Sequence, residues 1–190
     1  MYLPGALSAF LLKVKNRPNA EWITANDLKF DDATMKIANV GWGPHWQPWI
    51  LKGVHAPAAV FGPSSFVRKS TYNRIGEFDR ELHYSMDYDY WIRLTMNNVR
   101  QVRLNKICWA DRIQPCSKTF GVSDSNADTR KSSELRLVEN RHGYLYRFSF
   151  RNIWYCIWIL SRFLDLSLFV RWFSKMAYEG TPVSRLLGKK

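Results

Sequence analysis

One acidic stretch constrains the chain more than any other feature, because it combines a turn, two carboxylates and the start of a helix. Residues 76–79 have the composition of a turn, in which Gly76 supplies freedom in φ and Phe78 is expected to anchor the turn in the core. Asp87 and Asp89 follow, and the apolar residues after them have helical spacing. The sequence therefore predicts a helix over residues 88–98, with acidic side chains at its favoured N-terminal end.

Two roles are open for these carboxylates. They can simply cap the helix, because acids commonly satisfy the exposed N–H groups there. If the helix starts at the edge of a cleft, Asp87 can instead act as a general base. Asp89 and Arg93 would then support it, since Arg93 is placed to orient a carboxylate or balance its charge.

Composition allows one folded domain, or one domain with an appendage. The chain has 190 residues, a hydrophobic fraction of 46% that is ample for a core, and a formal charge of +12. Residues 126–190 carry 12 basic and 5 acidic side chains, so a basic, aromatic tail predicts an anionic partner. Three cysteines without CxxC spacing, and no signal peptide at the start, predict a reducing, cytoplasmic setting.

Three segments, taken in order, carry a resemblance to a known family. Residues 61–69, Ile75–Asp79 and Met86–Arg93 resemble, in order and spacing, the family 2 glycosyltransferases, which are inverting GT-A-type enzymes that use nucleotide-sugar donors. The resemblance implies that Asp87 is the catalytic base, because it matches the second acid of the family's acidic pair. Met86 stands at the position of the first acid, a variation also seen within the family.

The resemblance also implies an acceptor side. Gly62, Pro63 and Ser64 match a Pro-containing stretch that lines the acceptor side of the family's cleft. The preceding residues 36–60 are rich in Gly, Pro, Trp and His and are predicted to form a loop. Trp46 in this loop is a candidate for stacking on a sugar ring, and the alternative is that the tryptophans fold the loop onto the core.

The donor and metal side is expected to be incomplete. In the family, a segment like Tyr2–Leu7 commonly comes directly after the DxD motif, whose carboxylates hold the divalent cation, Mg²⁺ or Mn²⁺, of the donor diphosphate. Here the segment starts at residue 2, so the nucleotide-binding half and the main metal ligands are expected to be absent from this chain. A truncated gene, a misplaced start or a split enzyme would each explain this. The acidic pair at 31–32 is predicted to be a solvated turn.

A second donor-side motif is matched in part. Family members often carry Tyr-Arg-x-His followed by a flexible Ser-containing loop. Arg112 matches the Arg, but Gln114 occupies the His position, and its amide oxygen is a weaker metal ligand than an anionic group. Arg112 and Lys118 are therefore predicted to contact the donor diphosphate, with plain surface charge as the alternative.

The last third of the chain is predicted to be a helical extension. Residues 121–131 have the composition of a loop, either a lid or a linker, and a helix is expected over 134–150. The apolar stretch 153–173 contains Arg162 and Asp165, which argue against a membrane span. An amphipathic helix lying on an anionic membrane surface is expected, and packing on the catalytic domain or on another subunit is the alternative.

The sequence also predicts a helix after Pro4 with one apolar face and a short helix at 68–75. A short buried strand is expected at 21–24 with its exit at 26–27, and two extended segments at 99–104 and 106–110.

These features together predict an α/β fold. An incomplete GT-A-like, Rossmann-related mixed sheet with flanking helices is expected in residues 1–125, followed by a C-terminal amphipathic helical extension in 126–190. The predicted function is sugar transfer from a nucleotide-sugar donor to a glycan or lipid-linked acceptor, in the cytoplasm or on the inner face of its membrane. The alternative is a non-catalytic acceptor- or membrane-binding module, or a subunit completed by a separate nucleotide-binding chain. Nucleic-acid binding ranks last, because it does not explain the ordered motifs.

Overall fold

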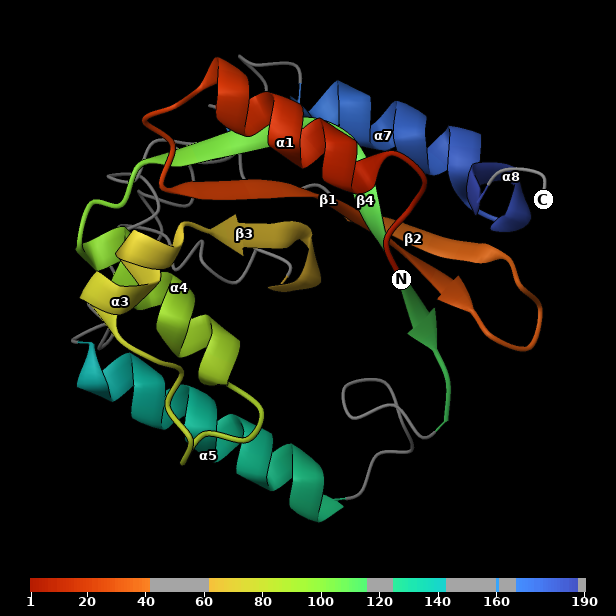
Figure 1. Ribbon diagram of the computed structural model, residues 1–190. Coiled ribbons are helices and arrows are strands. Elements are labelled where there is room, and N and C mark those ends of the chain that lie inside the picture. The colour runs from red at the N-terminus through yellow and green to blue at the C-terminus, as the bar shows by residue number, and fades with distance from the viewer. Residues whose placement is uncertain (42–61, 116–124, 143–159, 161–166, 188–190) are drawn as a thin grey trace.

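The computed structural model describes residues 1–41, 62–115, 125–142, 160 and 167–187, and the fold is mixed α/β (Figure 1). An open four-stranded sheet is flanked by helices. The strands are β1 (Trp22–Asp31), β2 (Ile37–Gly41), β3 (Ser65–Val67) and β4 (Gln101–Ile113). The helices are α1 (Ala6–Asn16), the 3-10 turn η2 (Gly62–Ser64), α3 (Lys69–Ile75), α4 (Met86–Met96), α5 (Ser125–Arg141), α7 (Ser167–Tyr178) and α8 (Ser184–Leu187).

Strand β1 organises the sheet, because every other strand pairs with it. β4 runs parallel to β1 along its whole length, whereas β3 and β2 pair antiparallel with its first and last parts. The sheet is therefore mixed, as the sequence predicted. The sequence expected a strand only at 21–24 with its exit at 26–27, and two extended segments at 99–104 and 106–110. Both expectations were too short, because β1 continues to Asp31 and β4 is a single strand.

Burial along β1 is nearly continuous because helices or loops cover both of its faces. Ile23 and Ala25 pack with Phe10 of α1, whereas Leu28 and Phe30 pack with residues at both ends of the chain. The apolar residues thus change from odd to even positions between Ala25 and Leu28. The pairing of β1 with β4 shifts register at the same place, around residue 26, which lets the strand keep its core side chains on one face.

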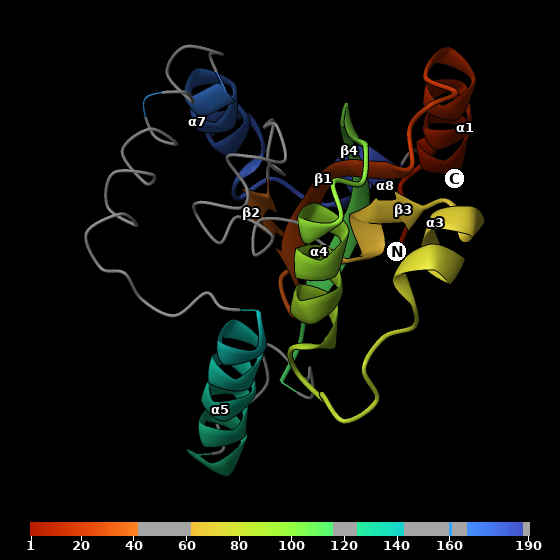
Figure 2. The ribbon, with the colours of Figure 1, turned by 90° about the vertical axis from the view of Figure 1, so that its left-hand side faces the viewer.

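Helices α1, α7 and α8 cover one face of the sheet (Figures 1 and 2). The sequence predicted a helix after Pro4 with one apolar face, and α1 confirms the helix. Ala6 and Phe10 are its buried residues, but Leu7 and Leu11 are exposed. Val183, the residue directly before α8, is fully buried and joins the core around Leu28.

Helix α4 packs on the opposite face of the sheet (Figure 2). The Trp91 ring stacks on Trp22 of β1, with centroids 5.4 Å apart and an interplanar angle of 10°. Phe78 was expected to be in the core. It is 39% exposed and covers the outer side of the Tyr90 ring, with centroids 4.5 Å apart. The turn at 76–79 therefore lies on the surface of this layer and not inside it.

Helix α5 corrects the predicted loop and the predicted helix boundary. Residues 125–131, expected to be part of a lid or linker, form the first two turns of this helix, which ends at Arg141. Its buried Val138 packs on Leu82 and Ile92. The chain from 126 onward therefore contributes to the core through both Val138 and Val183. The apolar stretch predicted over 153–173 falls mostly outside the described residues. Among the helices that are described, none has the length and apolar character needed to cross a membrane.

Candidate functional site

Asp87 is an exposed carboxylate in the first turn of α4. The helix begins at Met86, two residues earlier than predicted, so both acids lie inside it. One Asp87 carboxylate oxygen accepts a hydrogen bond from the backbone N–H of Tyr88, at 2.8 Å. Two residues of helix correspond to a rotation of about 200°, so Asp89 points to the opposite side. This geometry separates the roles of the two acids, because Asp87 faces solvent and Asp89 faces the core.

Asp89 is the structural member of the pair. Its side chain is only 2% exposed, and its two oxygens bond to Arg93 Nε and to His142 Nε2, each at 2.8 Å. Arg141 Nη1 lies 3.8 Å from the same Asp89 oxygen that bonds to His142. A buried carboxylate requires such partners, because an unpaired charge in the interior is strongly destabilising. Asp89 thus joins the end of α5 to the first turn of α4, the turn that also contains Asp87.

Arg93 orients a carboxylate, as predicted, but the carboxylate that it contacts is Asp89. Its guanidinium also donates to the carbonyl oxygens of Ile75, at 3.1 Å, and Glu77, at 2.7 Å. Gly76 between them has φ +93°, a conformation that L side chains rarely adopt. The glycine of the predicted turn therefore lets the chain fold back so that Arg93 can hold its carbonyls.

Glu134 and Arg141 of α5 hold the segment before α4, and His142, directly after α5, holds Asp89 in the first turn of α4; sequence reasoning did not identify these three residues. Glu134 is buried and one of its oxygens accepts the backbone N–H groups of residues 83, 84 and 85, at 2.6 to 3.1 Å. Burial opposes ionisation of Glu134, but these bonds and the contact with Arg130 outweigh it and lower its pKa. Arg141 bonds to Asp79 and thereby lowers the pKa of that carboxyl. His142 completes the set.

A sequence signal for these residues existed. Positions 134, 138, 141 and 142 have the spacing i, i+4, i+7 and i+8, which places them on one face of a helix. Three of the four side chains on that face are polar or charged. The pattern predicts a helix face buried against polar groups, but their partners lie about 50 residues away in the sequence and could not be named from it.

The predicted acceptor segment lies against the centre of β1. Ser64 is fully buried and its hydroxyl donates to the Asn26 carbonyl oxygen at 3.3 Å, so it serves to fix η2 on the sheet. Pro63 is the exposed residue beside it, and Gly62 begins the turn. Trp46, the predicted stacking residue, lies outside the described residues.

The predicted diphosphate contacts lie elsewhere or are not described. Arg112 is near the end of β4, is 53% exposed, and pairs with Asp32 at 3.5 Å. It therefore lies on a different element from Asp87, and its charge is partly balanced by a surface acid. Lys118 lies outside the described residues. Asp31 accepts the N–H and hydroxyl of Thr34, at 2.7 and 2.8 Å, which confirms a turn at this acidic pair.

Grouped metal ligands are absent from the described residues. Within them, no three His, Cys, Asp or Glu side chains come close enough together to share a metal ion. Gln114, the weak candidate ligand, is half-buried immediately after β4, and its neighbours in the sequence are Ile113 and Pro115. The chemistry considered below for Asp87 therefore includes no metal-dependent step.

A buried carboxylate in β1 is the other polar feature of this region. Asp27 is 0% exposed, and within the described part of the chain neither of its oxygens has a hydrogen-bond partner. Burial raises its pKa to about 7, Lys29 opposes this rise, and Asp111 adds to it. Asp111 is itself bonded to the indole N–H of Trp109. Asp27 follows Asn26, the residue on which η2 rests, so the sheet beneath the predicted acceptor segment carries an unsatisfied acid.

Comparisons with known proteins give no assignment: no model of a known protein family matches the chain, and no curated protein matches it.

Proposed function

We propose that the chain forms the acceptor side of a glycosyltransferase of the GT-A-related, family 2 type. It would transfer a sugar from a nucleotide-sugar donor to a glycan or lipid-linked acceptor. The proposal rests on the order and spacing of the three motifs in the sequence. The observation that carries it is the position of Asp87, an exposed carboxylate on a helix start that a buried ionic network holds in place.

Asp87 is suited to act as the general base of such a reaction. A base must be accessible to the substrate and must be held in one position. Its accessibility follows from the rotation along α4, and its position follows from Asp89, Arg93 and the Trp91–Trp22 stack. In an inverting transfer, Asp87 takes the proton of the acceptor hydroxyl as that oxygen attacks the anomeric carbon. The bond from the anomeric carbon to the diphosphate breaks, and the nucleoside diphosphate leaves with the bonding electrons.

The parallel pair β1–β4 supports the GT-A relationship that we propose. In open α/β sheets, ligands bind near the carboxyl ends of parallel strands. Arg112 lies at that end of β4, beside Asp32. We assign it to the donor diphosphate, where a guanidinium suits two anionic oxygens at once. Its present partner is a half-exposed acid, and the phosphate would replace it.

The test is a transfer and hydrolysis assay with UDP-, GDP- and dTDP-sugars, using the whole chain with and without Mn²⁺. Asp87→Asn should lower turnover by about 10²-fold or more, because general bases contribute about 10²- to 10⁴-fold. Glu81→Gln, an exposed acid in the segment before α4, is the matched control and should leave turnover unchanged. Turnover that is equal in the two variants would show that Asp87 is not the base.

A second candidate is a non-catalytic subunit that binds the acceptor and is completed by a separate nucleotide-binding chain. This candidate keeps the acceptor-side motifs of the chain and assigns the donor and metal ligands to the other chain. Calorimetry separates the two. Glycan binding without any nucleotide-sugar binding in the presence of Mn²⁺ would favour the subunit, whereas binding of both ligands would favour the enzyme.

A further inference from the structure

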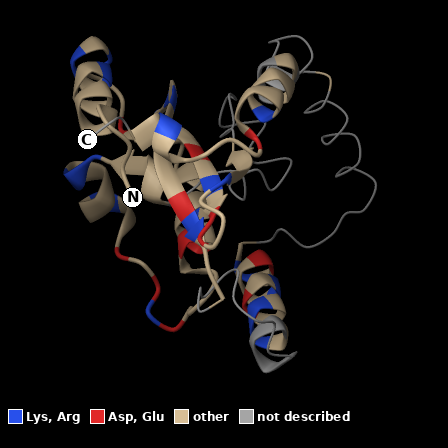
Figure 3. Cartoon of the chain, turned by 90° about the vertical axis from the view of Figure 1, so that its right-hand side faces the viewer, with Lys and Arg blue, Asp and Glu red and all other residues tan. Residues whose placement is uncertain are grey.

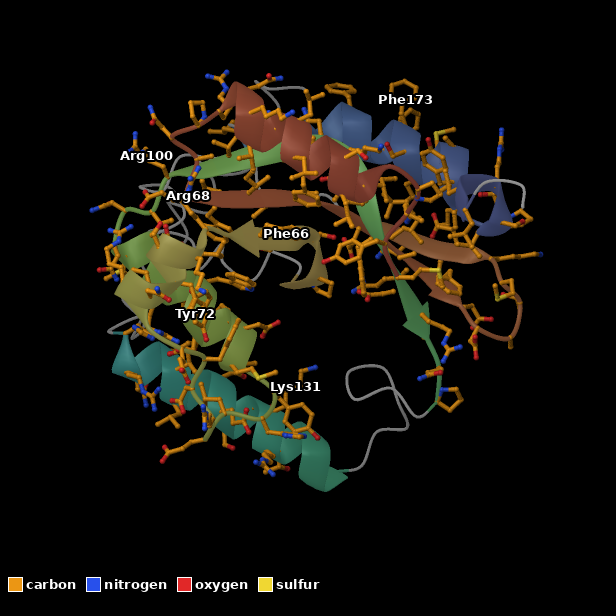
Figure 4. All side chains as sticks on the ribbon, viewed as in Figure 1. Phe66, Arg68, Tyr72, Arg100, Lys131 and Phe173 are labelled. Carbon is orange, nitrogen blue, oxygen red and sulfur yellow. The ribbon has the colours of Figure 1, made fainter. Side chains whose placement is uncertain are left out.

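Helix α7 presents an apolar stripe to solvent. Phe169, Trp172, Phe173 and Met176 are 50%, 56%, 61% and 66% exposed, and their spacing is i, i+3, i+4 and i+7. That spacing is what a helix normally uses to bury one face in a core. Tyr178, on the opposite face of α7, packs on the core around Leu28. Figure 4 shows the labelled Phe173 pointing away from the molecule.

Helix α1 has a similar exposed face. Leu7, Leu11 and Leu12 are 53%, 65% and 59% exposed, and Val14 is 40% exposed. Its buried side is complete without them, because Ala6 and Phe10 fill the contact with β1 and β4. Of the seventeen large hydrophobic side chains that are exposed in the described residues, eight lie on these two helices. Such clustering is unusual for solvent-facing surfaces and typically marks an interaction site.

The two apolar faces lie on the same side of the molecule. In Figure 1 both helices are above the sheet, and after the 90° rotation of Figure 2 both are still above it. They are separated sideways in Figure 2, with the sheet beneath and between them. Two such helices can touch one flat surface together. Helix α4, which carries Asp87, lies on the opposite side of the sheet.

The charge of the two helices identifies the surface. Neither α1 nor α7 contains an acidic residue, and each contains two basic ones: Lys13 and Lys15 in α1, and Arg171 and Lys175 in α7. Figure 3 shows this distribution, with blue but no red on α1. Basic groups beside exposed aromatic and leucine side chains are typical of helices that lie in an anionic membrane interface. A second copy of this chain is a poor partner, because each copy carries a formal charge of +12.

We propose that α1 and α7 together form a docking surface for an anionic lipid bilayer. The outer residues of both helices enter the boundary between headgroups and acyl chains, and Lys13, Lys15 and Lys175 supply positive charge for the lipid phosphates. The surface comprises Leu7, Leu11, Leu12 and Val14 with Phe169, Trp172, Phe173 and Met176. If the chain also transfers sugar, Asp87 faces away from the bilayer; this consequence alone depends on the proposed function.

Vesicle co-sedimentation of the whole chain tests the proposal, without any need for enzymatic activity. The probes are phosphatidylcholine vesicles, with and without about a quarter phosphatidylglycerol. We expect binding to the anionic vesicles that weakens as salt is raised. Phe173→Glu and Leu11→Glu should each lower the partition coefficient by about tenfold or more. Each removes an apolar side chain that enters the bilayer and adds a negative charge that anionic lipids repel. Both positions are exposed, so folding should survive, as circular dichroism can verify.

Leu137→Glu is the matched control, since Leu137 is 49% exposed but lies on α5, away from the proposed surface. It should bind vesicles as the parent chain does. Failure of the parent chain to bind anionic vesicles would overturn the proposal. So would unchanged binding by Leu11→Glu, because α1 would then take no part. Dimerisation in analytical ultracentrifugation that the same substitutions abolish would also overturn it, in favour of a protein interface.

Discussion

Replacing the buried Asp27 by Asn should stabilise the protein, and increasingly so as the pH rises. The side chain is fully buried, and no partner among the described residues bonds to its oxygens. Its pKa is raised from an ordinary value of 3.8 to about 7, with burial as the main cause. Folding therefore favours the protonated carboxyl. The stability associated with this proton is present at low pH and is lost as the pH rises from about 4 to about 7.

The size of the effect follows from the pKa difference. One pKa unit corresponds to about 1.4 kcal/mol, so the full loss is about 4 kcal/mol. Asn has nearly the same shape but cannot ionise. Asp27→Asn should therefore be more stable than the parent chain by about 2 kcal/mol at pH 5 and by about 4 kcal/mol at pH 8.

The measurement is urea-induced unfolding at several pH values between 5 and 8, with tryptophan fluorescence as the signal. Asp32→Asn is the control, because its carboxylate is 40% exposed and pairs with Arg112 on the surface. It should change stability by less than about 1 kcal/mol. If Asp27→Asn and the parent chain show the same pH dependence, then Asp27 is paired or hydrated in solution, and the reasoning from its burial is wrong.

Three further predictions concern the ionic network and the core. Asp89→Asn should lower the free energy of unfolding by about 3 kcal/mol, because it leaves Arg93 and His142 without their buried partner, and urea denaturation would measure this loss. Glu134→Ala should cost about 3 kcal/mol, because three backbone N–H groups lose their acceptor, and hydrogen exchange should accelerate at residues 83–85 but not in α1. Burial raises the pKa of Cys108 to about 11, so its thiol should resist dithionitrobenzoate at pH 8 until the protein unfolds, as peptide mapping would show.

Local patterns predicted the helices best. The helix over 88–98 and the helix after Pro4 both exist, because periodic apolar residues and N-terminal signals act within one or two turns. The short helix at 68–75 also exists as α3. The strands were predicted too short, since burial on both faces of β1 admits Asn26 and Asp27, which have poor strand propensity. Tertiary packing here outweighs the low strand propensity of these two residues, and that packing involves residues far away in the sequence.

The site shows where sequence reasoning stopped. The sequence identified Asp87, Asp89 and Arg93 as one group, and the i, i+4 spacing of Asp89 and Arg93 favours the ion pair that the structure contains. Local spacing could not show that Asp89 is buried. The burial of Asp89 depends on Arg141, at the end of α5, and on His142 directly after it, which contact Asp89 from 52 or more residues away in the sequence. Likewise, the hydrogen bond from Ser64 to the Asn26 carbonyl oxygen is a tertiary contact. Ser64 was predicted to line the acceptor side, but in the structure its hydroxyl fixes η2 on β1.

The sequence by itself determined that a helix begins with two carboxylates after a glycine turn, because helical spacing, dipole and glycine φ are local properties. Only the tertiary structure decided that Asp89 is buried and Asp87 exposed, since this depends on which side of α4 meets the sheet and α5. The same holds for α1 and α7. Their apolar stripes are visible in the sequence. In the structure, Ala6, Phe10 and Tyr178 make the contacts with the core, and the remaining apolar residues of these helices face outward.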